Sequence, residues 1–177
     1  MYRYLPAVAP LVAFVLSSGA LGGAAADRCA AEAPAIVEIT EALAAATTPT
    51  ARAALRHGRG RLLHDRGHEV QARADYDAAL ALDPDLAVAY LDRGRLFADQ
   101  ARYPAALADF DRAIELQPAL LAAHLQRGDL RYEIGDHIGA VADFAAAIDI
   151  DAKSPAAYLG RANALRDDGR ADQALAD

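Results

Sequence analysis

The chain has 177 residues, of which 54% are hydrophobic and 24% charged, and its formal net charge is −7. This composition is typical of a globular protein of one modest domain and excludes extensive disorder. No basic stripe for phosphate groups is present, so we expect no nucleic-acid partner.

Residues 1–26 have the pattern of a secretory signal peptide. Arg3 supplies a positive charge, LVAFVLSSGALGG is an apolar core, and AAA at residues 24–26 forms an A-x-A cleavage site. An uncleaved anchor is the alternative, but the prolines and glycines of this segment make a poor spanning helix, so we expect no stable membrane span after cleavage. The alanine-rich composition is typical of a bacterial genome, and the sequence therefore predicts a periplasmic or secreted protein.

Residues 27–50 form an N-terminal segment ahead of a regular pattern. Ile36, Ile39 and Leu43 recur at helical spacing, and the TTPT stretch at residues 47–50 ends that helix. We expect this helix to cap the open apolar edge of the repeats that follow. Cys29 is the only cysteine, so an internal disulfide is excluded and the fold must be held by packing.

Residues 51–177 form the main domain, in which the pattern repeats every 34 residues without an insertion. The rows are residues 53–86, 87–120 and 121–154, with a partial row at 155–177. Four columns define them: small residues (Gly60, Gly94, Gly128, Ala162), aromatic residues (Tyr76, Phe110, Phe144), turn residues (Gly67, Ala101, Gly135, Gly169) and arginines (Arg59, Arg93, Arg127, Arg161).

Each row predicts two helices joined by a turn. Tyr90, Gly94 and Phe97 share one face of a first helix at about 100° per residue, and Ala106 and Phe110 share one face of a second. Small residues let the two backbones approach closely, and the aromatic side chain fills the space beside them. The turn column suits glycine at positive φ, so Ala101 suggests a turn of higher energy or different shape. Pro84 and Pro118 end the second helix.

This pattern resembles the tetratricopeptide repeat, a helix–turn–helix unit of this length. The resemblance covers residues 53–177 and identifies an exported bacterial member of that family. It implies an all-α fold, an α-solenoid, whose inner curve binds a peptide or helix of a protein partner. A column of aspartates follows the arginines sixteen residues downstream: Asp75, Asp109, Asp143 and Asp177. Charge pairing between helices is one interpretation of the two columns, and a solvated face is the other.

Candidate partner-binding residues lie on the expected inner curve of the first helices: Arg61, Leu91, Arg95, Leu125, Asp129, Tyr132, Leu159 and Asn163. Leu91, Leu125 and Leu159 share one column, and we expect them to be exposed to a ligand; single surface leucines without function are the alternative. Related repeats grip a terminal carboxylate in these columns. Arg61, Arg95 and Asn163 partly resemble that clamp, but Asp129 interrupts it.

No residues predict catalysis, a cofactor or a metal site. His57, His64 and His68 cluster early in the first row, but the turn glycine Gly67 separates His64 from His68, so we expect solvated or helix-capping histidines. Gly58 and Gly60 follow no strand and lack the third glycine of a dinucleotide fingerprint. No Ser-His-Asp or Cys-His spacing indicates an enzyme, and the protein is expected to be none.

We therefore expect a protein-interaction scaffold in the periplasm. The alternative is a structural or assembly protein that forms homo-oligomers through the open edge of its last repeat. The fourth row ends at Asp177, and a second helix of residues 170–177 would be short. We expect it to leave Leu165 partly exposed.

Overall fold

A computed structural model describes residues 35–170 of the chain, and this part contains helices and no strands. The predicted signal peptide, Cys29 and Asp177 lie outside the described residues. Residues 35–45 are helical, and seven further helices follow in chain order: α2 (Pro49–His64), α3 (Glu69–Leu82), α4 (Ala87–Asp99), α5 (Tyr103–Leu116), α6 (Leu121–Glu133), α7 (His137–Ile150) and α8 (Pro155–Asp167). None of the described helices combines the length and hydropathy needed to cross a bilayer.

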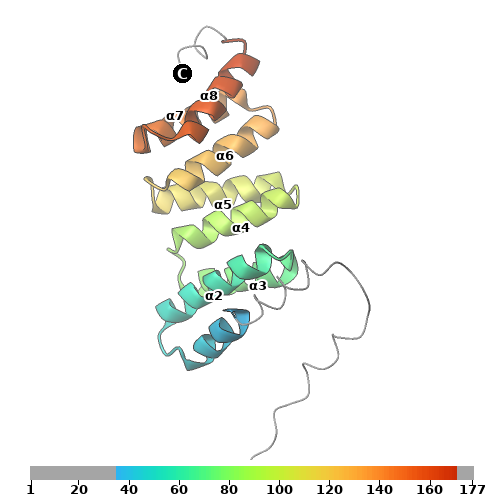
Figure 1. Cartoon of the computed structure of the whole chain (residues 1–177), viewed down its shortest axis with the longest axis vertical. Helices are drawn as coiled ribbons and strands as arrows, with labels where there is room; N and C mark the ends of the chain where they lie inside the picture. Colours follow the sequence, from blue (N-terminus) through green and yellow to red (C-terminus); the bar gives the residue numbers. More distant parts are fainter. Residues whose placement is uncertain (1–34, 171–177) are drawn as a thin grey trace, which may run out of the picture. The chain divides into compact units, whose positions relative to one another are not determined.

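The helices recur with the predicted period. First helices α4, α6 and α8 begin at Ala87, Leu121 and Pro155, each 34 residues after the one before, and α3, α5 and α7 are spaced in the same way. Helices α2, α4 and α6 each pack on the second helix of their own repeat, and α3, α5 and α7 each pack in turn on the following first helix. Figure 1 shows α2 to α8 stacked in this order. The all-α repeat architecture is therefore confirmed.

Helix ends follow from local chemistry. α2 begins at Pro49, four residues before the first row, because the Thr48 side chain accepts a hydrogen bond from the Ala51 amide at 3.2 Å. α3 and α5 end at Leu82 and Leu116, two residues before the predicted prolines. Sequence reasoning missed the cap of α8, where the Ser154 hydroxyl accepts from the Ala157 amide.

The turn column has one backbone conformation in all four rows. Gly67, Gly135 and Gly169 have φ values of 76°, 84° and 80°, and Ala101 has a φ of 55°. The turn at Ala101 therefore has the same left-handed form as the others. A Cβ atom in this region costs roughly 1–2 kcal/mol relative to glycine, so the expected higher energy is located at Ala101 itself.

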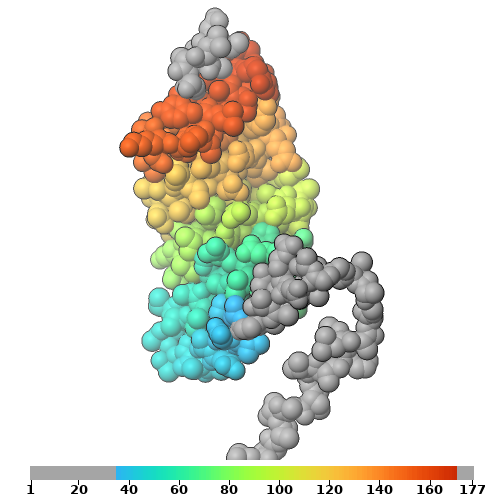
Figure 2. All heavy atoms as spheres, in the orientation of Figure 1, coloured from blue at the N-terminus to red at the C-terminus, as the bar shows by residue number. Residues whose placement is uncertain are grey.

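Close contact between the small and aromatic columns forms the core of each repeat. A Cβ atom at Gly94 would lie 2.7 Å from Phe110 Cε1 and 3.3 Å from the Ala106 carbonyl oxygen, and one at Gly60 would lie 2.7 Å from Tyr76 Cε1. The aromatic rings are almost completely buried, and Figure 2 shows successive helices in continuous contact. This confirms the predicted approach of the two backbones.

The arginine and aspartate columns pair in each row that the structure describes in full. Arg59, Arg93 and Arg127 donate through Nε to aspartate carboxylates sixteen residues downstream, at 2.6–3.0 Å: Asp75, Asp109 and Asp143. These three aspartate residues are 2%, 6% and 2% exposed as whole residues. Charge pairing is therefore confirmed for these rows, and the solvated-face interpretation is wrong for them.

The same arginines also connect neighbouring repeats. Arg93 Nη1 donates to Asp77 at 2.7 Å, and Arg127 Nη1 donates to Asp111 at 2.6 Å, so each guanidinium contacts carboxylates of two repeats. Arg59 has no such acid upstream; its Nη1 donates instead to Thr40 in the helix over residues 35–45, at 3.1 Å. This contact agrees with the capping role expected for that helix, which stays a prediction.

Asp75 illustrates the electrostatic balance in these pairs. Burial pushes the pKa of its carboxyl upward, but hydrogen bonds from Arg59 and Arg56 outweigh that effect and hold the pKa below its ordinary value. The ionised form is thus the stable one in the folded protein.

Leu165 was expected to be partly exposed, but it is 4% exposed. That expectation is wrong because Leu165 lies on the packed face of α8.

Gly94→Ala and Gly58→Ala should change the free energy of unfolding in opposite directions. The first Cβ collides with the Phe110 ring and should destabilise the protein by about 1–3 kcal/mol. The second has no heavy atom within 4 Å and should stabilise α2 by about 0.5–1 kcal/mol. Urea unfolding of both variants measures this. Equal effects would mean that helix propensity, and not the glycine–aromatic contact, governs both positions.

Arg93 should couple more strongly to Asp109 than to Asp77. The Asp109 side chain is 9% exposed and that of Asp77 is 50% exposed, so Asp109→Ala should cost about 3 kcal/mol and Asp77→Ala less than about 1 kcal/mol. Double-mutant cycles with Arg93→Ala measure the two couplings. If both were near zero, the pairs would not stabilise the fold.

Candidate functional site

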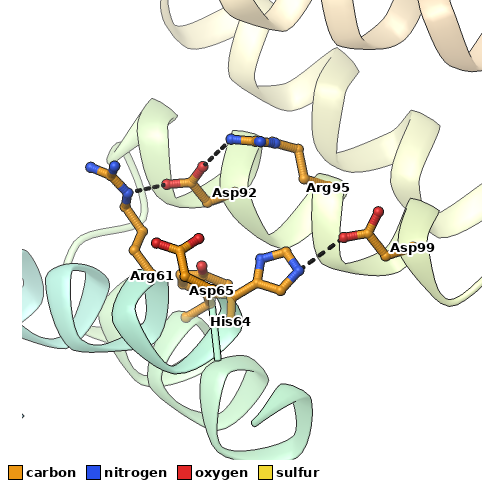
Figure 3. Close-up of a pocket in the computed structure, with 7 residues that line it drawn as sticks. Arg61, His64, Asp65, Asp92, Arg95 and Asp99 are labelled. Atoms are coloured by element: carbon orange, nitrogen blue, oxygen red, sulfur yellow. Dashed lines mark hydrogen bonds and ion pairs between the residues drawn. The ribbon is translucent and has the colours of Figure 1, made fainter. Parts of the chain in front are cut away.

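A pocket of about 260 Å³ lies between the first helices of repeats one and two (Figure 3). Its lining comes from α2 and the residue that follows it, from α4, and from one aromatic side chain of the second helix α3. We call it the Asp92 pocket, and it is lined by Arg61, His64, Asp65, Tyr76, Asp92, Arg95 and Asp99. It thus combines three carboxylates with two guanidinium groups.

Asp92 is the most enclosed carboxylate of this pocket and is 9% exposed. Its Oδ2 atom lies 2.7 Å from His57 Nε2 and 3.6 Å from Arg61 Nε, and its Oδ1 atom lies 3.6 Å from Arg95 Nη1. At 3.6 Å the arginines attract Asp92 without forming hydrogen bonds. Their side chains are 62% and 54% exposed, so both heads are accessible at the rim.

Two histidines belong to this surface. His57 pairs with Asp92, and His64 Nε2 lies 2.9 Å from Asp99 Oδ2, so the expectation of solvated or helix-capping histidines is wrong for both. The reason is that stacking brings a residue near the position 35 further along, in the next first helix. His68 does occupy the N-cap position of α3, without a capping side-chain hydrogen bond. Within residues 35–170 no group of three potential ligands could hold a metal ion.

Tyr76 carries a buried polar atom at this pocket. The residue is 0% exposed, and its hydroxyl oxygen has no hydrogen-bond partner among the described residues. Burial raises the pKa of the hydroxyl, and the negative charges of Asp92 and Asp65 raise it further, so the group keeps its proton. The other described rows place phenylalanine in this column, and that contrast is the sequence signal that could have identified Tyr76.

A second pocket, of about 410 Å³, adjoins the first through Asp99. We call it the Asp129 pocket; it is lined by Ala98, Asp99, Ala101, Tyr103, Phe110, Gln126, Asp129, Leu130 and Glu133. Three carboxylates and no cationic side chain face this space. Partial desolvation raises the pKa of Asp129, and the Tyr103 hydroxyl donates to Glu133 at 2.9 Å.

The structure brings three of the predicted binding residues to these pockets. Arg61 and Arg95 line the Asp92 pocket, and Asp129 lines its neighbour. Tyr132 is half-buried, and its hydroxyl donates to Asp167 at 2.5 Å. Leu159 and Asn163 lie on α8 and line neither pocket.

The expected exposure of the leucine column is wrong for Leu91 and is only partly met at Leu125. Leu91 is 7% exposed and packs with Phe97 and Phe110, because a residue three positions before Gly94 is turned only about 60° from it on a helix. Leu125 is half-buried against Phe144 and its neighbours. Only Leu159, at 65% exposed, has the expected accessibility among these three.

Comparison with solved structures places this arrangement among known folds. A crystal structure of MamA aligns with a TM-score of 0.73 at 22% identity, covering 88% of this chain and 90% of that chain. A tetratricopeptide repeat protein from Parabacteroides merdae gives 0.65 at 25% identity, over 87% and 59%. The first such domain of Spaghetti, solved with the HSP90 peptide SRMEEVD, gives 0.63 at 19% identity, over 72% and 96%.

No curated protein matches the chain. The family model of the tetratricopeptide repeat matches residues 57–120, 91–155 and 125–177. These overlapping matches span more than half of the chain, and their residues form the recurring helix pairs described above. The chain therefore belongs to the tetratricopeptide repeat family.

Proposed function

We propose that the protein is an interaction scaffold that binds a peptide or helix of a partner protein along the first helices of its repeats. The observation that carries this proposal is the pair of adjoining pockets, which share Asp99 and offer charged groups that the fold leaves accessible. A neighbouring structure of the same fold was solved with a peptide bound. Recognition by a row of side chains suits an extended or helical segment.

The proposed compartment is the bacterial periplasm, supported by the signal-peptide pattern of residues 1–26. Expression of the full chain in a Gram-negative host should give a periplasmic product whose first residue is Asp27. Cell fractionation and N-terminal sequencing measure this. Recovery of the intact N-terminus in the cytoplasmic fraction would contradict export, and an intact chain in the membrane fraction would favour an anchor.

Selection of random peptides on the purified protein tests the binding proposal. Selected peptides should shift the amide resonances of α2, α4 and α6 that surround the two pockets. Asp129→Lys should weaken binding by about tenfold or more, because it reverses a charge inside the Asp129 pocket.

Asp149→Lys is the matched control, since it makes the same charge change on the exposed surface of α7. Its affinity should stay within about twofold of the parent. Absence of any selected peptide, or shifts confined to other helices, would contradict the proposal. A protein that binds no peptide but forms oligomers in light scattering would favour self-association instead.

A further inference from the structure

We infer that the Asp92 pocket receives a basic side chain, lysine or arginine, from the bound peptide. This inference rests on the proposed function and specifies the chemistry of the partner at one position.

The charge of the pocket favours a cation. Its lining has three carboxylates, on Asp65, Asp92 and Asp99, and two guanidinium groups, on Arg61 and Arg95, which gives a formal charge of −1 when His64 is neutral. One added positive charge would neutralise the lining. The adjoining Asp129 pocket adds Asp129 and Glu133 without a cation, so it reinforces the same preference.

Two polar groups in this pocket have no hydrogen-bond or ion-pair partner in the part of the chain that the structure describes. The Asp65 carboxylate makes no hydrogen bond or ion pair within residues 35–170, and Figure 3 shows it pointing toward the same space as Asp92. The Tyr76 hydroxyl is buried and unsatisfied beside them. Its oxygen can accept a hydrogen bond from an ammonium or guanidinium group, which also offers donors to both carboxylates.

An acidic side chain would fit the same space poorly. The two arginines already face Asp92 from the rim, and a ligand carboxylate held between them would approach the charges of Asp92 and Asp65. A buried like-charge contact is destabilising. The pocket therefore discriminates between partners by the sign of the side chain that enters it.

Heptapeptides with a Ser-Ala-Ser-X-Ser-Ala-Ser sequence and blocked ends provide a direct test. X is arginine, its neutral analogue citrulline, or glutamate, and binding is followed by amide chemical shifts. The arginine peptide should bind about tenfold more tightly than the citrulline peptide. The glutamate peptide should be the weakest of the three.

Two variants assign this preference to the pocket. Asp65→Asn should reduce affinity for the arginine peptide by about tenfold, and Tyr76→Phe should reduce it by about threefold. Neither variant should change the affinity for the citrulline peptide. Phenylalanine occupies the same column at residues 110 and 144, so Tyr76→Phe should fold normally, and thermal unfolding checks this. Asp149→Asn removes one negative charge from exposed α7 and should leave every affinity within about twofold.

The result distinguishes this inference from the broader proposal. Equal binding of the arginine and citrulline peptides, tighter binding of the glutamate peptide, or indifference to both pocket variants would overturn it. If peptides from the random selection bound these helices through acidic residues, the inference of a basic side chain would be overturned and the scaffold function would stand. If the random selection gave no binding peptide, the scaffold function itself would be contradicted.

Discussion

Arginine–aspartate pairing is the interaction that fixes the two helices of each repeat against one another and connects that repeat to the one before. Each of Arg93 and Arg127 contacts a nearly buried carboxylate in its own repeat and a more exposed one in the repeat before. A buried aspartate without its partner would be strongly destabilising, so the second helix of a repeat cannot slide relative to its own first helix. The glycine–aromatic contact sets the distance between these two helices, and the bonds to the exposed carboxylates of Asp77 and Asp111 add a weaker link to the repeat before.

The stacking of the repeats has a direct consequence for the surface of the first helices. It brings His57 beside Asp92, His64 beside Asp99 and Tyr132 beside Asp167, all separated by 35 residues. Polar pairs thus recur between successive first helices at these three places. Asp65 and the Tyr76 hydroxyl form no such pair within the described residues, and the Asp92 pocket lies where these two groups meet.

Fold and specificity are therefore separate properties of this chain. Neighbours with about 20% identity share the helical framework, because glycine, alanine and aromatic columns are sufficient to build it. Of the side chains that line the two pockets, Tyr76, Ala101 and Phe110 belong to those columns and the charged ones do not. The acidic lining is a feature of these particular residues, and it is the basis for expecting a basic segment in the partner.

Sequence alone determined the period, the helix ends near Pro84 and Pro118 and the contact of Gly94 with Phe110, and it offered the pairing of Arg93 with Asp109 as one of two interpretations. These features lie within one repeat and follow from local helix geometry, and comparison of the rows reveals the residues involved. Tertiary structure decided the burial of Leu91, the partners of His57 and His64, and the meeting of Arg61, Arg95 and Tyr76 at one pocket. Those features depend on how far each repeat is rotated and shifted on the next, and that displacement is set by packing across the whole interface between repeats rather than by the residues of either repeat.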